Sequence, residues 1–252
     1  MLNTISHGAP GAAPTVLIVH GLFGSARNWG VIAKRLADRG RVVAVDQRNH
    51  GGSPWYDTHS YPDMAADLAK VIEAEGGPVD VVGHSMGGKA AMVLALTRPE
   101  LVRRLVVADI APVGYGHSQQ QFIDAMRAVD LSRVTKRSDA SAQLAERVED
   151  TTLQAFFTQS LDVSGKRWLL NLDTLEREMP KILGFPQVSG RFDGPALFLT
   201  GAQSTYVQPE HRETIRTLFP RARFAKIPGA GHWLHADKPR EFEASVRVFL
   251  DG

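Results

Sequence analysis

The chain has 252 residues, a length that one hydrophobic core can cover, and its composition, 43% hydrophobic and 22% charged, is that of an ordinary globular domain. It contains no cysteine, which excludes disulfide frameworks, thiolate zinc sites and a cysteine nucleophile. Lysine and arginine number 29 against 27 acidic residues, and the net charge of +2 is too small to attract nucleic acid.

The N-terminal segment carries no sign of a targeting sequence. Residues 1–14 lack both the basic and the apolar stretch of a secretory leader, and the apolar run at 16–19 is too short to span a bilayer. The absence of cysteine permits a reducing compartment. We therefore expect a cytoplasmic protein without a membrane span.

Short apolar runs rich in β-branched residues alternate with segments of helical period, which is typical of a parallel sheet flanked by helices. The predicted strands cover residues 15–20, 41–46, 79–84, 104–109, 196–200 and 223–227. Helices are predicted over 29–39, 62–75 and 88–96, and a final helix begins at Pro239 with Phe242, Val246 and Phe249 facing inward. The predicted fold class is α/β.

The alternation stops after Pro112 and resumes at Gly194. Between residues 114 and 191 no run is a convincing strand, and helical segments are predicted at 120–129, 138–157 and 172–183. Such an excursion between two strands is more often a lid than a linker. We expect residues 1–113 and 192–252 to form the core, with 114–191 a helical cap inserted in the same domain. We expect most of its large apolar residues to pack helix on sheet, with apolar contact to an acyl group as the alternative: Phe122, Met126, Phe156, Phe157 and Trp168.

The sequence Gly-His-Ser-Met-Gly at 83–87 joins a predicted strand to a predicted helix, which is the context of a nucleophile elbow. Glycines two positions before and after Ser85 leave room for a sharp, strained turn. The backbone N–H of Met86 lies at the helix start, where negative charge is stabilised. We predict that Ser85 is a nucleophile and Met86 an oxyanion donor. The alternative is a serine in a chance glycine-rich turn.

A second glycine-rich sequence, His-Gly-Leu-Phe-Gly at 20–24, follows the first predicted strand. In a parallel sheet this loop lies at the same edge as Ser85, and it can turn one backbone N–H toward the oxyanion. We predict Leu22 as that donor, with Phe23 as the alternative. The segment also serves as a tight turn between strand and helix, and both roles are compatible.

A general base is expected downstream of Ser85, because in this type of fold the order along the chain is serine, acid, histidine. His232 lies in a glycine-rich loop after the last predicted strand, and the glycines allow the loop to reach over the sheet edge. His235 is better placed to help start the final helix, and His211 lies on a helix with the character of a surface residue. His232 is the predicted base.

The acid departs from the commonest arrangement. Ser204 occupies the position after the penultimate strand where a carboxylate normally stands, and a hydroxyl cannot stabilise an imidazolium as a carboxylate does. Asp109 ends the preceding strand at the carboxyl edge, whereas Asp193 precedes a strand and Asp46 comes too early in the chain. Elimination therefore favours Asp109, and the alternative role for it is an ordinary cap.

Two further polar features have structural interpretations. The segment 46–53 lacks the spaced ligands of a metal site, so we interpret it as a buried polar loop that braces the active-site edge. Lys89 lies one helical turn after Ser85 and is interpreted as a structural helix residue rather than a second base.

These motifs together resemble those of the YbfF-like esterases of bacteria, a branch of the α/β-hydrolase superfamily with a small helical cap. The matching segments are 20–25, 48–51, 83–89, 109–112 and 229–233. In that group the strand ending Asp-Ile-Ala-Pro supplies the acid, which implies Asp109 for this chain. The resemblance also implies an α/β-hydrolase fold and carboxylesterase or thioesterase activity on small acyl substrates, without a cofactor.

The predicted function is hydrolysis of a carboxylic ester, in which His232 activates Ser85, Asp109 orients His232, and Leu22 and Met86 bind the oxyanion. A cofactor-free perhydrolase or a carbon–carbon bond hydrolase would use the same triad. A ligand receptor without turnover is a third possibility. Epoxide hydrolases and haloalkane dehalogenases need a carboxylate nucleophile and are disfavoured by Ser85, and dinucleotide binding is disfavoured by the incomplete glycine pattern after the first strand.

Overall fold

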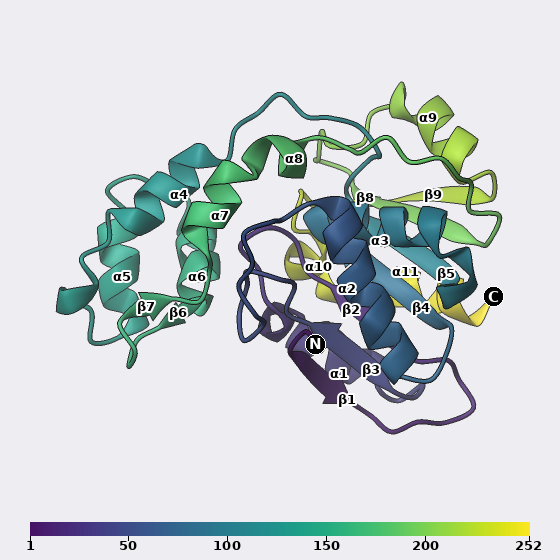
Figure 1. Ribbon diagram of the computed structural model, residues 1–252, viewed down its shortest axis with the longest axis horizontal. Helices are drawn as coiled ribbons and strands as arrows, with labels where there is room; N and C mark the ends of the chain where they lie inside the picture. The colour runs from purple at the N-terminus through teal and green to yellow at the C-terminus, as the bar shows by residue number, and fades with distance from the viewer.

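A computed structural model describes residues 1–252, and its centre is a sheet of seven strands in the order β1-β3-β2-β4-β5-β8-β9 (Figure 1). β1 is antiparallel to β3, and all other neighbours in this sheet are parallel. The strands are β1 (Thr4–His7), β2 (Val16–Val19), β3 (Val42–Val45), β4 (Val79–His84), β5 (Val102–Ala108), β8 (Ala196–Gly201) and β9 (Ala222–Ile227).

The predicted strands all appear within two residues of their expected ends, and β1 is the one strand of this sheet that was not predicted. β1 is an edge strand whose residues alternate between exposed and half-buried. Its single strongly apolar residue, Ile5, gives too weak an alternation to indicate a strand. Only pairing with β3 makes it one.

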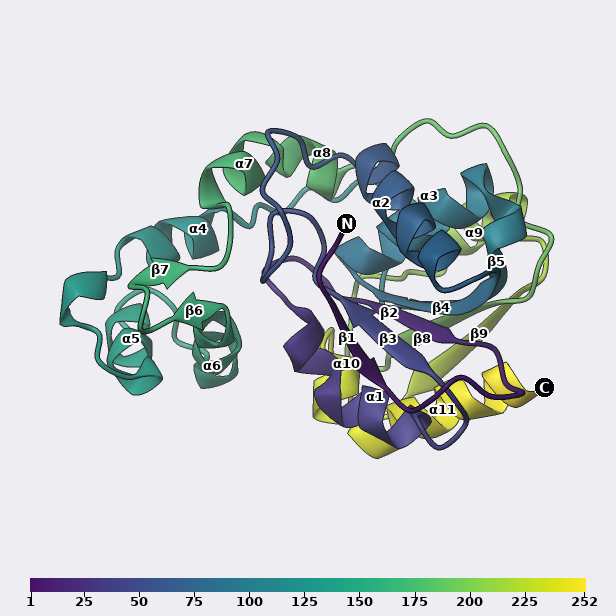
Figure 2. The same ribbon diagram turned by 60° about the horizontal axis from the view of Figure 1, so that its bottom comes forward.

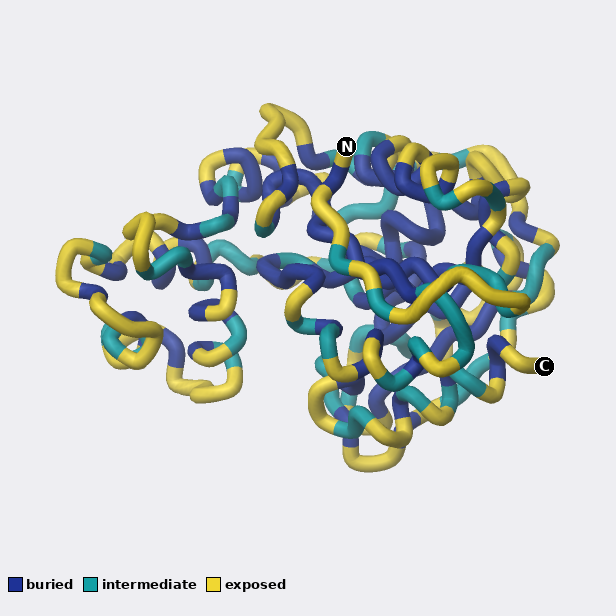
Figure 3. Tube along the Cα trace, turned by 90° about the horizontal axis from the view of Figure 1, so that it is seen from below, coloured by how far each residue is buried: buried dark blue, intermediate teal, exposed yellow.

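Helices cover both faces of the sheet (Figure 2). One face carries α1 (Gly30–Leu36), α10 (Leu234–Asp237) and α11 (Pro239–Asp251); the other carries α2 (Tyr61–Ala74), α3 (Met86–Thr97) and α9 (His211–Leu218). Alternate residues of each strand enter two separate cores: in β2, Leu17 and Val19 pack on the α2 and α3 side, whereas Val16 and Ile18 pack on the α1 and α11 side. In Figure 3 the central strands of the sheet form the buried interior.

The segment between β5 and β8 forms a separate lobe beside the sheet (Figure 1). It contains α4 (Gln120–Arg127), α5 (Arg137–Leu144), α6 (Thr151–Gln159), β6 (Leu161–Asp162), β7 (Arg167–Trp168), α7 (Leu172–Arg177) and α8 (Met179–Leu183). The pair β6 and β7 is a two-residue antiparallel ladder, so the expectation of no strand in this segment was wrong. Two residues a strand are too few to leave a periodic signal in the sequence.

Two helices predicted as continuous are each divided in the structure. Residues 138–157 split into α5 and α6, because the Asp150 side chain accepts hydrogen bonds from the N–H groups of Thr152 and Leu153 and starts a new helix. Residues 172–183 split into α7 and α8 at Pro180, which has no N–H to donate to the preceding turn. None of the helices is both long and apolar enough to cross a bilayer.

The sheet order brings distant parts of the chain to one edge. β2, β4, β5 and β8 are consecutive neighbours and parallel, so their carboxyl ends lie side by side. The residues that follow these ends are His20, Ser85, Asp109 and Ala202. Loops at such an edge are the usual location of binding sites in parallel α/β sheets.

Candidate active site

Ser85 lies in the turn between β4 and α3 with φ 51° and ψ −120°. This region of backbone conformation is sparsely populated for residues other than glycine and costs about 1–3 kcal/mol. The turn also needs small neighbours: a Cβ on Gly87 would lie 2.4 Å from the carbonyl oxygens of Val19 and His20, and one on Gly83 would lie 2.5 Å from the Gly87 oxygen. The strained turn lifts Ser85 out of the sheet and toward the lobe between β5 and β8.

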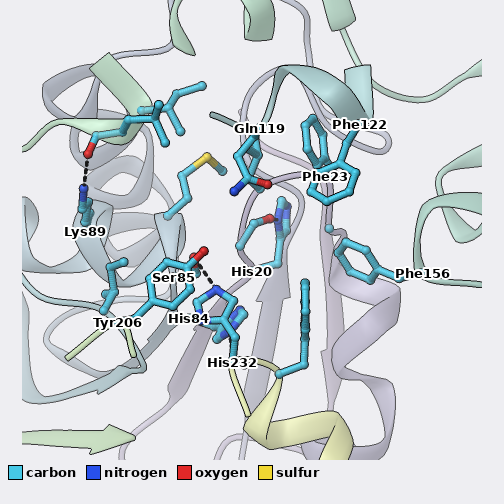
Figure 4. Close-up of a pocket in the computed structure, with 18 of the residues that line it drawn as sticks. His20, Phe23, His84, Ser85, Lys89, Gln119, Phe122, Phe156, Tyr206 and His232 are labelled. Carbon is cyan, nitrogen blue, oxygen red and sulfur yellow. Dashed lines mark hydrogen bonds between the residues drawn. The ribbon is translucent and has the colours of Figure 1, made fainter. Parts of the chain in front are cut away.

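Three predicted site residues come together at the sheet edge. His232 Nε2 lies 3.0 Å from Ser85 Oγ (Figure 4). On the other side of the ring, His232 Nδ1 lies 2.8 Å from Asp109 Oδ2. Asp109 is fully buried, whereas the imidazole is 13% exposed. Because a carboxylate only accepts hydrogen bonds, Nδ1 carries the proton and Nε2 is free to accept from the Ser85 hydroxyl.

The loop that carries His232 is fixed by its neighbours. His84 Nε2 lies 2.8 Å from the His232 carbonyl oxygen, and the Tyr206 ring stacks on the imidazole with centroids 3.8 Å apart and planes at 16°. Burial lowers the pKa of His84 well below its usual range, so the ring is neutral and its one N–H donates to that carbonyl. His232 is therefore held through both its backbone and its ring.

The backbone of residues 20–24, which we name the oxyanion loop, is held by buried histidines. The Gln47 N–H donates to His20 Nε2 at 2.9 Å, so His20 Nδ1 carries the proton and donates to the Gly21 carbonyl at 2.7 Å. The Gly24 N–H donates to the same carbonyl at 3.1 Å. Since carbonyl and N–H point in opposite directions in a trans peptide, these bonds fix the direction of the Leu22 N–H.

Phe23, the alternative oxyanion donor, is already engaged. Its N–H donates to His50 Nε2 at 3.2 Å, while His50 Nδ1 lies 2.9 Å from the Arg48 carbonyl. The N–H groups of Leu22 and Met86 donate to no acceptor of the protein. This arrangement favours Leu22 and Met86 as the two free donors beside Ser85.

A model of the alpha/beta hydrolase family matches residues 16–245 of the chain. The chain belongs to this family. It is 46% identical over 248 residues to the sn-1-specific diacylglycerol lipase ABHD11 of Mus musculus, covering 94% of this chain and 81% of the relative. It is 37% identical over 238 residues to esterase YbfF of Escherichia coli K12, covering 94% and 92% of the two chains. A solved structure of a marine microorganism esterase superposes on this hydrolase with a TM-score of 0.92 and 36% identity, covering 98% of each chain.

These matches confirm two predictions from the sequence, the α/β-hydrolase fold and the resemblance to YbfF-like esterases. The structure places two further residues at the site, one that the sequence indicated was unimportant and one that it did not indicate. Ser204, dismissed as unable to replace a carboxylate, donates from its hydroxyl to Asp109 Oδ2, and the Gly201 N–H donates to Asp109 Oδ1 at 3.1 Å. Tyr206, the second, gave no signal in the sequence beyond its place after the penultimate strand.

A cavity of about 320 Å³ opens above Ser85 in this hydrolase, and its wall is mainly apolar. Phe122, Phe156 and Phe157 line it from the lobe between β5 and β8, whereas we expected most of the apolar residues there to pack helix on sheet. Met126 and Trp168 do not line it: Trp168 Nε1 donates to the Met126 carbonyl at 2.9 Å, so these two pack within the lobe.

Lys89 is the one Lys, Arg, Asp or Glu residue in the cavity wall of this hydrolase, and it is 1% exposed. Its Nζ donates to the carbonyls of Leu183 at 2.9 Å and Gly184 at 2.5 Å, at the end of α8, and Figure 4 draws one of these two bonds. Nζ also lies 4.8 Å from the centre of the Tyr115 ring. Burial lowers the pKa of Lys89 to about 7. These contacts fit the structural role predicted for it, and they tie α3 to α8.

Segment 46–53 supports the oxyanion loop through the Gln47 and His50 contacts described above. Asp46 Oδ1 accepts from the Ala26 N–H at 2.7 Å, and its Oδ2 accepts from the Gly52 N–H at 2.9 Å. No group of three or more histidine, aspartate or glutamate side chains in this hydrolase is arranged to hold a metal ion.

Proposed function

We propose that this hydrolase cleaves carboxylic esters of small molecules with Ser85 as nucleophile, His232 as general base and Asp109 as the residue that orients the base. The observation that carries the proposal is the chain of contacts from Ser85 Oγ to His232 Nε2 at 3.0 Å and from His232 Nδ1 to Asp109 Oδ2 at 2.8 Å. The esterase names of its relatives support the same reaction class.

The reaction begins when His232 Nε2 takes the Ser85 proton while Ser85 Oγ forms a bond to the acyl carbon. Negative charge then develops on the former carbonyl oxygen, which the N–H groups of Leu22 and Met86 bind. As the tetrahedral intermediate collapses, the bond to the leaving alcohol or thiol breaks and His232 returns the proton to it. The acyl group stays on Ser85.

Deacylation repeats these steps with water in place of Ser85. His232 removes a proton from the water, whose oxygen attacks the acyl carbon, and the Ser85 oxygen leaves with the proton. Asp109 stabilises the positive charge that forms on the imidazole in both halves of the reaction. The hydrogen bonds that Asp109 accepts from Ser204 and Gly201 hold the carboxylate beside His232.

We further propose that residues 114–191 are a cap over the active site and that residues 1–113 and 192–252 form the catalytic core. The support is the cavity wall, which combines Phe122, Phe156 and Phe157 from the cap with Leu22 and Trp233 from the core. An apolar cavity of this kind suits an apolar acyl chain better than a charged substrate group. The cytoplasmic location stays a prediction from the sequence.

The test is the initial rate of hydrolysis of p-nitrophenyl esters from acetyl to palmitoyl. Ser85→Ala protein serves as the blank, and Ser245→Ala, which removes an exposed hydroxyl from α11, serves as the matched control. We expect turnover by the wild type and by the control, and none above background in the blank. No turnover of any ester by the wild type would favour a carbon–carbon bond hydrolase or a receptor instead.

The acid is tested separately with Asp109→Asn. An amide cannot hold the same tautomer of His232, so kcat is expected to fall by about 10³ or more. Asp193→Asn, at the opposite edge of the sheet and paired with Arg191 at 2.9 Å, is the matched control and keeps wild-type turnover. Near wild-type activity in Asp109→Asn protein with an unchanged circular dichroism spectrum contradicts the assignment.

A further inference from the structure

The cap contacts the oxyanion loop through one buried hydrogen bond. Ser160, the residue that follows α6, donates from its Oγ to the Phe23 carbonyl at 3.0 Å, although the two residues are 137 positions apart. Both residues are 2% exposed. A hydrogen bond between a hydroxyl and a carbonyl that is shielded from water is costly to break, because neither group can form a hydrogen bond with water instead.

The Phe23 backbone needs such a link. Its φ is 63°, in the left-handed region that bulky residues rarely adopt and that persists only where the surroundings hold it. Three contacts hold it here. The Phe23 N–H donates a hydrogen bond to His50, and its carbonyl accepts one from Ser160. Its ring packs edge-on against Phe157 with centroids 5.7 Å apart. Two of the three contacts come from the cap.

The Ser160 hydroxyl is not needed to end the helix. The Ser160 N–H already donates to the Phe157 carbonyl at 2.9 Å, and the Ser160 carbonyl accepts from the Leu169 N–H at 2.8 Å. The backbone therefore completes both the end of α6 and the contact to β7. The hydroxyl is therefore free to bind the oxyanion loop, where its acceptor is the carbonyl of Phe23, the residue that follows Leu22.

We propose that Ser160 is a positioning residue for ester hydrolysis, through which the docked cap holds the Leu22 N–H in the direction that binds the oxyanion. The inference rests on the proposed function. Without the Ser160 bond, Phe23 relaxes toward ordinary backbone angles and turns the neighbouring peptides with it. The cap then acts on the chemical step itself as well as on the binding of substrate.

The experiment uses an ester and an inhibitor that are too small to depend on the cap for binding. Ser160→Ala is compared with wild type for kcat and KM on p-nitrophenyl acetate. The inhibition constant of phenylboronic acid is measured in parallel, because its tetrahedral adduct with serine requires the oxyanion donors. Loss of a donor typically costs about 10²–10³ in turnover, so a displaced donor is expected to cost about 10–100-fold.

The expected result for Ser160→Ala is a fall in kcat by that factor, an equal rise in the inhibition constant, and a KM within about twofold of wild type. Ser160→Thr keeps the hydroxyl and is expected to recover most of the activity. Thr158→Val is the matched control, because it removes a buried hydroxyl two residues earlier, on α6, that bonds only to the Ala155 carbonyl of the same helix at 3.1 Å. We expect Thr158→Val to leave kcat and the inhibition constant of phenylboronic acid unchanged.

Wild-type kcat and boronate affinity in folded Ser160→Ala protein would overturn the inference and leave the proposed function intact. If Ser160→Ala fails to fold, Ser160→Cys takes its place, since it keeps the side-chain size and offers only a weak donor, and the same losses are expected. A wild-type protein that neither hydrolyses the ester nor binds the boronic acid would overturn the proposed function and this inference together.

Discussion

Replacing Lys89 with methionine tests how this buried amine affects stability. The ordinary pKa of lysine is 10.5, and burial lowers the pKa of Lys89 to about 7. The native pKa is thus about 3.5 lower, which at about 1.4 kcal/mol for each pKa unit disfavours the charged native form by about 5 kcal/mol. No acidic side chain forms an ion pair with Lys89, so burial is not compensated by an opposite charge.

The sign of the pH dependence follows from proton counting. Between pH 7 and 10.5 the unfolded chain retains a proton on Lys89 that the native protein has released, so stability rises with pH over this window. From pH 7 to pH 9 this single group raises the free energy of unfolding by about 2 kcal/mol. Tyr61 and Tyr115 do not interfere, because burial raises the pKa of each above 10 and they act only above that pH.

The measurement is urea-induced unfolding of wild-type and Lys89→Met protein at pH 7, 8 and 9. We expect the difference in the free energy of unfolding, wild type minus variant, to increase by about 2 kcal/mol from pH 7 to pH 9. Lys70→Met, at an exposed position of α2, is the control and shows no such increase. A Lys89→Met protein with the same pH dependence as wild type would refute the reasoning.

Two further predictions follow from the contacts of the site. Ser204→Ala removes a charge-assisted hydrogen bond to Asp109 that is worth about 1.5 kcal/mol. We therefore expect kcat/KM for p-nitrophenyl butyrate to fall about tenfold, whereas the control Thr205→Ala, at an exposed position, leaves it unchanged. Equal values would show that Asp109 is held without Ser204. Burial lowers the pKa of His235 to about 3, so between pH 6.5 and 3 the unfolded chain binds a proton that the native protein does not, and stability falls as pH falls. His235→Phe keeps the stacking on Trp29 and should reduce the loss of unfolding free energy between pH 7 and 5 by about 2 kcal/mol; an undiminished loss contradicts this origin.

The sequence was sufficient for the features that depend on neighbours along the chain. The strained turn at Ser85 is visible because Gly83 and Gly87 are needed within two residues of it, and the parallel sheet is visible because each buried strand is a short apolar run. Asp109 was reached by elimination, since few acidic residues follow a strand. The order of strands in such a sheet then predicts that these positions share one edge.

The tertiary structure alone revealed contacts between residues far apart in the chain. Ser204 reaches Asp109 across 95 positions and Ser160 reaches Phe23 across 137, and neither serine has a local pattern that sets it apart. The same holds for Tyr206, whose ring meets His232 only because their two loops follow neighbouring strands. Local patterns reflect backbone geometry and burial, which the sequence encodes at short range. The packing of side chains around Ser85, His232 and Asp109 depends on long-range proximity, which is determined only when the sheet and the lobe between β5 and β8 assemble.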